Sequence, residues 1–276
     1  MQKKYTNSQL RHLFLQQSCL DAWEEYLRQI KTGTAIGWDY VILTASNEEQ
    51  AAVYRREIEY RLSLRKLPSK TRYLVLEDPE GRRVGSGGAT LNVLKAIAER
   101  EQKEEENFFS GLRILVIHSG GDSKRIPQYS TCGKLFSPVP RVLPNGQAST
   151  LFDEFMVTTS MIPGRMQEGM LVMSGDVLLL FNALQIDTQF NGAAAISIKE
   201  DVDTGKNHGV FLGDEKENVK KFLHKQTVET LTELGAVNRQ HQVDLDTGAI
   251  LMDSSMLESL YSLISTENKV DDAKFD

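Results

Sequence analysis

The chain has 276 residues, of which 40% are hydrophobic and 25% are charged, the balance of a soluble globular protein. Its net charge of -6 is mild and acidic, so we expect no nucleic-acid partner, which would favour a basic stripe. The sequence contains no apolar run of the roughly 18 residues that a membrane span needs, and its N-terminus lacks the apolar core of a signal peptide. Two distant cysteines, Cys19 and Cys132, complete a pattern that predicts a cytoplasmic protein with no membrane partner.

The predicted elements begin with a helix. Apolar residues recur at helical spacing through residue 31, and Gly33 and Gly37 follow, so we expect a helical extension over residues 1–36. A second domain is predicted over residues 37–276. Its strands are expected at 38–44, 73–76, 112–118, 171–174, 193–198, 210–212, 219–223 and 248–252. Its helices are expected from a capping box at Ser46 and Glu49 to residue 64, from about Ala89 onwards, and over 254–264.

Strands that alternate with helices predict an α/β fold. We expect a mostly parallel sheet covered by helices on both faces, which is a three-layer, Rossmann-like arrangement. The strands at 210–212 and 219–223 are candidates for a hairpin across Gly213-Asp214. Ligands of such sheets bind beyond the carboxyl ends of the strands. Two glycine-rich segments and one aspartate, Asp176, are predicted at that edge.

The first glycine-rich segment is Gly85-Ser86-Gly87-Gly88, directly before a predicted helix. Flexible backbone in front of a helix N-terminus binds anions such as the phosphates of a nucleotide. A tight turn between a strand and a helix explains the same glycines equally well. The spacing matches neither the dinucleotide fingerprint nor the P-loop.

The second glycine-rich segment follows a predicted strand and carries two spaced cations. Gly120, Gly121, Asp122 and Ser123 form the loop, whose backbone amides are predicted to bind a triphosphate. Arg125 is predicted to cover the leaving pyrophosphate, and Lys134 to reach the phosphates or a sugar phosphate. A solvated charge is the alternative for either cation. The segment indicates a protein that handles a nucleoside triphosphate or a nucleotide sugar.

Asp176 follows a predicted strand and Gly175, and it is the candidate metal ligand. A carboxylate beside a triphosphate is the usual way to hold Mg²⁺, which keeps several waters and takes one or two protein ligands. A turn aspartate is the alternative. Asp246 is a candidate for a second carboxylate.

The strings VGSGGATLNVL (84–94), IHSGGDSKRIPQYSTCGKLFSPVP (117–140) and LVMSGDVLL (171–179) resemble the sugar nucleotidyltransferases, and among them the fucose-1-phosphate guanylyltransferase family. Ser123 and Lys124 depart from the common G-G-x-G-T-R signature, and His118 before the loop is typical of this branch. The resemblance implies a glycosyltransferase-A-like fold and a reaction of GTP with L-fucose 1-phosphate that gives GDP-L-fucose and pyrophosphate.

The resemblance also implies a sugar-binding region. It points to Gly209, Lys225, Thr247 and Gly248 as substrate-binding residues, although hairpin chemistry explains the same residues. Two other functions stay open: a sugar kinase (L-fucokinase), an activity that the family often carries on the same polypeptide, and a non-catalytic module that binds a nucleotide sugar. The chain is short for the family, whose members generally continue into a β-rich domain.

Overall fold

The computed structural model describes residues 7–101, 107–119, 133–266 and 269–271. The chain divides into two compact units, one of Met1–Ala193 with Leu251–Asp276 and one of Ala194–Ile250. Among the described residues, no helix has the length and apolar character needed to cross a membrane.

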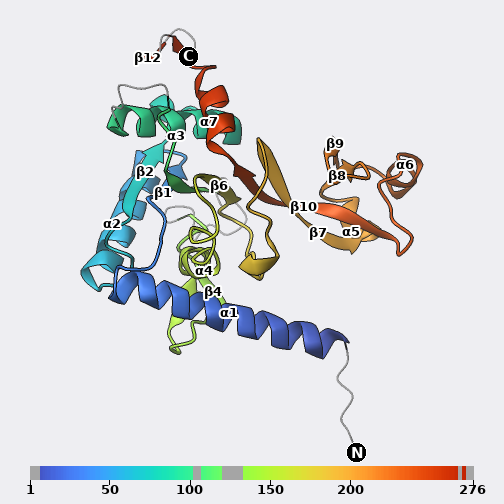
Figure 1. Cartoon of the computed structure of the whole chain (residues 1–276), viewed down its shortest axis with the longest axis horizontal. Helices are drawn as coiled ribbons and strands as arrows, with labels where there is room; N and C mark the ends of the chain where they lie inside the picture. Colours follow the sequence, from blue (N-terminus) through green and yellow to red (C-terminus); the bar gives the residue numbers. More distant parts are fainter. Residues whose placement is uncertain (1–6, 102–106, 120–132, 267–268, 272–276) are drawn as a thin grey trace, which may run out of the picture. The chain divides into compact units, whose positions relative to one another are not determined.

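The described helices and strands alternate along much of the chain (Figure 1). The α-helices are α1 (Asn7–Lys31), α2 (Glu48–Ser63), α3 (Gly85–Glu101), α4 (Leu151–Thr158), α5 (Val202–Gly205), α6 (Val228–Glu233) and α7 (Ser254–Tyr261). The strands are β1 (Tyr40–Ala45), β2 (Arg72–Glu77), β3 (Arg113–His118), β4 (Pro138–Val142), β5 (Ala148–Thr150), β6 (Gly169–Ser174), β7 (Ala193–Asp201), β8 (Gly209–Gly213), β9 (Val219–His224), β10 (Gln242–Met252), β11 (Ser265–Thr266) and β12 (Lys269–Val270).

Four parallel strands in the order β2-β1-β3-β6 form the sheet of the first unit. The strands end in register, because Thr44 pairs with Leu76 and His118, and His118 pairs with Ser174. Leu251 and Met252, at the end of β10, also belong to this unit, and β10 follows β6 in the strand order. The register therefore brings the carboxyl ends of four strands to one edge, where the sequence predicts the site.

Helices cover both faces of this sheet, as the apolar strands require. One face packs on α3 and α7 in a single buried cluster that includes Ile42, Ile114, Leu94 and Leu257. The alternate strand residues, such as Leu43 and Ile117, are equally buried and face the side of α2 and α4 (Figure 1). The α/β fold with helices on both faces of a largely parallel central sheet is confirmed.

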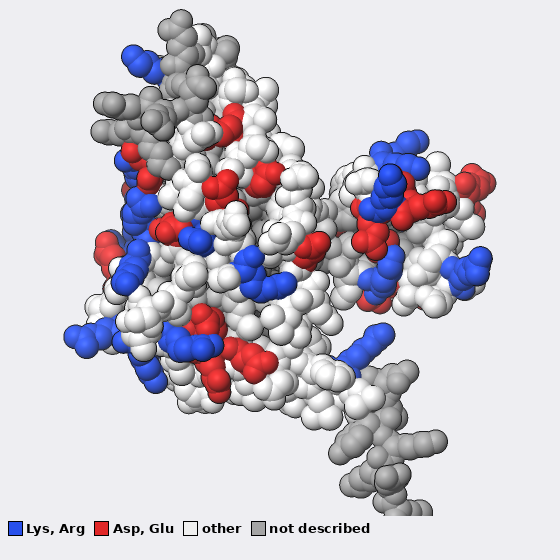
Figure 2. All heavy atoms as spheres, in the orientation of Figure 1, with Lys and Arg blue, Asp and Glu red and all other residues white. Residues whose placement is uncertain are grey.

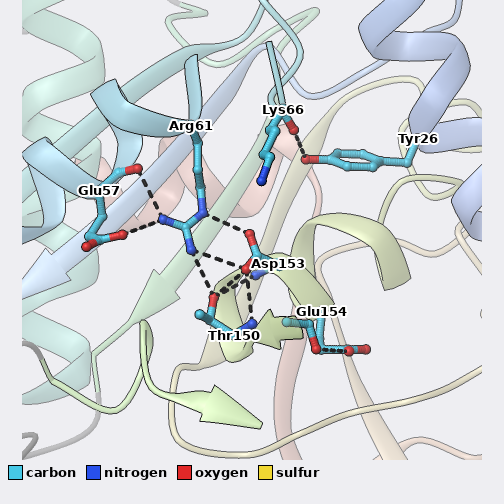
Figure 3. Close-up of polar contacts among 8 residues, drawn as sticks. Tyr26, Glu57, Arg61, Lys66, Thr150, Asp153 and Glu154 are labelled. Atoms are coloured by element: carbon cyan, nitrogen blue, oxygen red, sulfur yellow. Dashed lines mark hydrogen bonds and ion pairs between the residues drawn. The ribbon is translucent and has the colours of Figure 1, made fainter. Parts of the chain in front are cut away.

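A buried arginine ties α2 to the start of α4 (Figure 3). Arg61 is 8% exposed, and its Nε donates to Asp153 Oδ1 at 2.8 Å while Nη1 donates to Glu57 Oε2 at 2.5 Å. Asp153 also closes a capping box with Thr150, the N-cap of α4. The guanidinium lies 4.9 Å from the ring centroid of Phe136, so this network also holds the segment that follows Lys134.

Helix α1 packs on the first unit through its C-terminal half. Tyr26 is buried and its hydroxyl donates to the carbonyl of Lys66 at 2.7 Å. Ser160, just beyond α4, donates to the carbonyl of Ala22 at 2.8 Å. The N-terminal half of α1 is exposed, with Phe14 at 72%. The helix predicted for the start of the chain is thus present, and it is anchored at one end.

The second unit contains the hairpin of β8 and β9, with β10 antiparallel to β8 and paired with β7. Its small core is made of Val202, Val210, Leu223, Leu231 and Val243. The predicted hairpin is confirmed, because Val210 pairs with Leu223.

Basic and acidic side chains intermingle over the first unit on the face that Figure 2 shows. On this face, charges of both signs are interspersed and form no extended area of one sign.

Two helix starts differ from the sequence prediction. Helix α3 begins at Gly85 and not near Ala89, so the glycines form its first turn. Asn47 and not Ser46 caps α2, because the Asn47 side chain accepts from the Gln50 amide. Asparagine and serine are equally good caps, so the pattern alone did not choose between neighbours. Helix α4 and the β4–β5 pair were not predicted.

Candidate active site

A cleft of about 290 Å³ opens at the carboxyl ends of the parallel strands. Residues from the ends of β1, β2, β3 and β6 and from the first turn of α3 line it: Thr44, Ala45, Ser46, Asp78, Arg83, Gly85, Ser86, Ala89, His118, Ser119 and Ser174. Five of the eleven lining residues carry a hydroxyl group: Thr44, Ser46, Ser86, Ser119 and Ser174. Such a surface suits a ligand that is rich in hydrogen-bond acceptors, such as a phosphate.

The first glycine segment contributes to this cleft through its leading residues. Gly85, which has a φ of 70°, and Ser86 both line it, whereas Gly87 and Gly88 continue the first turn of α3. The free amides of a helix N-terminus therefore lie at the cleft, as anion binding requires. The glycines thus form the turn into the helix, and their predicted role in anion binding stays a prediction.

Lys134 and Asp176 come together from segments 42 residues apart. Lys134 Nζ lies 3.2 Å from Asp176 Oδ2, and each side chain is about one third exposed. Ser174, which lines the cleft, donates to Asp176 Oδ1 at 2.7 Å. Burial alone would raise the pKa of Asp176, but the bonds from Ser174 and Lys134 outweigh it and lower the pKa. Asp176 is therefore an ionised carboxylate beside a cation at the edge of the cleft.

Lys134 and Asp176 each follow a glycine at which the backbone comes very close to another element. A Cβ at Gly175 would lie 2.6 Å from the His118 carbonyl oxygen, so only glycine allows the turn that carries Asp176 to sit against β3. Gly133 has a φ of 64°, and a Cβ there would lie 2.2 Å from the Tyr54 hydroxyl on α2. The segment that bears Lys134 can thus approach α2 only through a glycine.

Gln50, in the first turn of α2, ties together the ends of β1 and β3. Its Oε1 accepts from the Ser46 amide at 2.9 Å and lies 3.3 Å from the Ser119 hydroxyl. The side chain of Gln50 is buried. The start of the second glycine-rich segment is therefore held at the cleft by a side chain from α2.

His118, the last residue of β3, lines the cleft. Its Nδ1 lies 3.2 Å from the Thr44 hydroxyl, and its Nε2 lies 3.0 Å from the Thr90 hydroxyl. Burial lowers the pKa of His118 from 6.5 to about 4, so the ring is neutral at physiological pH.

The other residues of the predicted phosphate loop lie outside the described residues. These are Gly120, Gly121, Asp122, Ser123 and Arg125. Their predicted roles stay predictions, although Ser119 and Gly133, on either side, both lie against α2 through Gln50 and Tyr54.

The predicted sugar-binding residues lie in the second unit, where they gather at one end of the hairpin. Gly209 pairs with His224, and Lys225 follows with a φ of 51°. A Cβ at Gly209 would lie 2.4 Å from the Phe222 ring and 3.2 Å from Asp246, the candidate second carboxylate.

Thr247 and Gly248 lie in β10 of the same unit. The Thr247 hydroxyl donates to the Ile196 carbonyl, and the Gly248 amide donates to Asp246 Oδ1 at 2.8 Å. These bonds are local sheet contacts, which the hairpin alternative also explains. The substrate-binding roles stay predictions.

Sequence reasoning missed several residues of the cleft. Thr44 lies near the end of β1, and Ser46 and Asp78 directly follow β1 and β2; this position is the signal that could have found them. Burial raises the pKa of Asp78, and the charge of Arg83 opposes this in part. Arg83 stands two residues before the first glycine-rich segment, and no role was predicted for it.

A family model described as the fucose pyrophosphorylase domain matches residues 106–274, which is more than half of the chain. The chain belongs to the fucose pyrophosphorylase family. The match includes Lys134 and Asp176 and the second glycine-rich segment, while the first glycine-rich segment lies before it.

Two curated relatives have names that refer to fucose pyrophosphorylase or fucose-1-phosphate guanylyltransferase activity. The bifunctional fucokinase/GDP-fucose pyrophosphorylase of Arabidopsis thaliana is 32% identical over 243 residues, 77% of this chain and 23% of that protein. The fucose-1-phosphate guanylyltransferase of Mus musculus is 32% identical over 216 residues, 74% of this chain and 35% of that protein. The chain thus spans about a quarter to a third of the length of these two relatives. A solved structure, HddC from Yersinia pseudotuberculosis, aligns with a TM-score of 0.39 and 11% identity over 90% of this chain and 66% of that one.

The donor set at Asp176 fits Mg²⁺. The carboxylate is ionised and partly exposed, and the hydroxyl of Ser174 stands beside it, so both side chains offer hard oxygen atoms. Among the described residues, no group of three or more His, Cys, Asp or Glu side chains gathers as a metal site. A magnesium ion here would depend on Asp176 together with ligand oxygens and water.

Proposed function

We propose that this protein is a sugar-1-phosphate nucleotidyltransferase that joins GTP to L-fucose 1-phosphate and releases pyrophosphate. The observation that carries the proposal is the Lys134–Asp176 pair, 3.2 Å apart, beside a cleft that receives the N-terminus of α3. Family membership and the names of the relatives support the choice of guanine nucleotide and fucose. A cytoplasmic location is part of the proposal.

The chemistry needs alignment and charge neutralisation more than acid–base catalysis. An oxygen of the sugar 1-phosphate attacks the α-phosphorus of the triphosphate, and the bond to pyrophosphate breaks. The attacking phosphate is already ionised near pH 7, so a general base is not required. The amides at Gly85 and Ser86 would bind phosphate oxygens, and Lys134 would neutralise charge that moves onto the leaving group.

Asp176 would hold Mg²⁺ in this proposal, and the ion would neutralise phosphate charge when bound. The carboxylate already balances the charge of Lys134 in the absence of ligand. A triphosphate would offer Lys134 a second, more highly charged partner.

A pyrophosphate-release assay tests the proposal. The full chain is incubated with GTP, Mg²⁺ and fucose 1-phosphate, and then with other nucleotides and sugar phosphates. Asp176→Asn and Lys134→Ala are each expected to lower kcat by roughly 100-fold or more, because each removes charge that acts on the transition state. Asp187→Asn and Lys31→Ala are matched exposed controls and should retain wild-type rates.

Three outcomes separate the candidate functions. Release of pyrophosphate that depends on fucose 1-phosphate supports the transferase. Transfer of the γ-phosphoryl group from a nucleoside triphosphate to free fucose, seen as formation of the nucleoside diphosphate, would indicate a kinase instead. Tight nucleotide binding without turnover of any sugar phosphate would replace it with a non-catalytic binding module.

A further inference from the structure

The ring of His118 hydrogen-bonds to both β1 and α3, two elements that also pack together in the buried cluster. His118 is the last residue of β3, and its two nitrogens meet threonine hydroxyls of different elements. Thr44 on β1 lies 3.2 Å from Nδ1, and Thr90 on α3 lies 3.0 Å from Nε2. One side chain thus contacts both β1 and α3.

The surrounding bonds select one tautomer of the ring. The Thr90 hydroxyl donates to the Ser86 carbonyl at 2.9 Å, so its oxygen is left to accept a hydrogen bond from Nε2–H. Nδ1 then carries no proton and accepts from the Thr44 hydroxyl. The Thr44 oxygen accepts in turn from the Ser119 amide at 3.3 Å. With the proton on Nε2, every donor in this chain of bonds meets an acceptor.

Both ends of this hydrogen-bonded chain reach the cleft. Ser86, in the first glycine-rich segment, and Ser119, just before the second, both line it. The ring between them therefore couples the position of the Ser86 carbonyl to that of the Ser119 amide. Catalysis that relies on alignment is sensitive to displacements of about 1 Å.

We propose that His118 is a positioning residue whose neutral ring, with its proton on Nε2, holds the first turn of α3 against the ends of β1 and β3 at the phosphate-binding cleft. The proposal rests on the proposed function for the identity of the ligand. The geometry of the bridge is independent of that function. Burial of the ring, which lowers its pKa to about 4, keeps the bridge intact at physiological pH.

Isosteric variants test the bridge while keeping the volume of the site. Thr90→Val and Thr44→Val each remove one hydroxyl, and His118→Phe removes both nitrogens. Thr232→Val is the matched control, because Thr232 also donates to the carbonyl four residues earlier in its helix, at 2.7 Å, and no histidine contact is recorded for it. All four variants are made in the full chain and checked for cooperative unfolding.

The first readout is the tautomer itself, measured by ¹⁵N NMR of labelled histidine together with the amide shifts of Ser86 and Ser119. We expect the Nε2–H form in the wild type, a loss of that preference in Thr90→Val, and shifts of both amides. A wild-type ring with its proton on Nδ1, or with both nitrogens protonated at pH 7, would overturn the proposal. This readout needs no activity, so it stands even if the transferase assay fails.

The second readout is GTP affinity and the split between KM and kcat. Thr90→Val and His118→Phe should raise the Kd or KM for GTP by about 10- to 100-fold, and the Thr90→Val/His118→Phe double variant should be no worse than His118→Phe alone. Folded variants that bind GTP as the wild type does would refute the positioning role. A wild type that binds no nucleotide would refute the proposed function, and the tautomer and amide shifts would then decide on the bridge.

Discussion

Replacing Arg61 by alanine should destabilise the first unit more than any exposed arginine can. The Arg61 side chain is 10% exposed, and it bonds to both carboxylate oxygens of Asp153 at 2.8 and 3.2 Å. Its guanidinium also lies over the Phe136 and Phe152 rings at 4.9 and 5.7 Å. The substitution would leave Asp153, 20% exposed, without its cation.

The expected cost follows from these contacts. Breaking a buried pair from one side costs about 3–5 kcal/mol, and Asp153 keeps its bonds to Thr150, which favours the lower end. Loss of the contacts with the two rings adds about 1 kcal/mol. We therefore expect a loss of about 4 kcal/mol. Arg55→Ala is the matched control on the same helix, since Arg55 is 40% exposed and its pairs with Glu48 and Glu77 should contribute about 0–1 kcal/mol.

Urea unfolding followed by circular dichroism measures both variants. Arg61→Ala should lower Cm without a change in the slope, while Arg55→Ala should remain close to the wild type. Arg61→Lys should have a Cm between those of the two variants, because lysine keeps the charge but not the bidentate hydrogen bonds to Asp153. If Arg61→Ala and Arg55→Ala lie within about 1 kcal/mol of each other, the network does not have the role assigned to it.

Three further predictions concern the site and its supports. Because burial lowers the pKa of His118 from 6.5 to about 4, the unfolded chain takes up the proton first, so stability is complete above pH 6.5 and falls by up to about 3 kcal/mol as the pH drops to 4. His118→Asn should flatten this slope in unfolding curves taken across that range, and an unchanged slope would contradict the assignment. Gly175→Ala should lower the free energy of unfolding by about 1–3 kcal/mol, because the added Cβ would lie 2.6 Å from the His118 carbonyl oxygen. Gly164→Ala is the control and should be nearly neutral, because the nearest atom to its Cβ is 3.9 Å away. Thermal unfolding measures both variants. Asp253 is the N-cap of α7, and its carboxylate accepts a hydrogen bond from the Met256 amide. Asp253→Ala should therefore lower the free energy of unfolding by about 1 kcal/mol. No loss in the same assay would mean that water replaces the cap.

Much of the fold could be predicted because its signals are local. Buried strands such as β1 and β3 are runs of apolar residues bounded by polar ones, and the hairpin of β8 and β9 has a Gly-Asp turn between two such runs. Helix α4 was missed, although Thr150 and Asp153 form a capping box at its start, because its eight residues span only about two turns.

The sequence predicted the kind of site, but only some of the residues that form it. Lys134 and Asp176 were found because each stands beside a glycine near the end of a strand, and the structure brings them within 3.2 Å. Thr44 was not singled out although it stands near the end of a strand, and Thr90 was not found because a threonine within a helix gives no sign of a histidine contact. The pairing of His118 with both residues spans 74 and 28 positions of sequence.

The sequence by itself determined the alternation of strands and helices, the glycine-rich segments and the residue types that face phosphate, since each depends on neighbours within a few positions of the chain. The tertiary structure decided which of these residues meet. The register of the parallel strands places Thr44, His118 and Ser174 side by side, and the close approaches at Gly133 and Gly175 place Lys134 against Asp176. Contacts of this kind depend on the packing of whole elements, which local patterns do not encode.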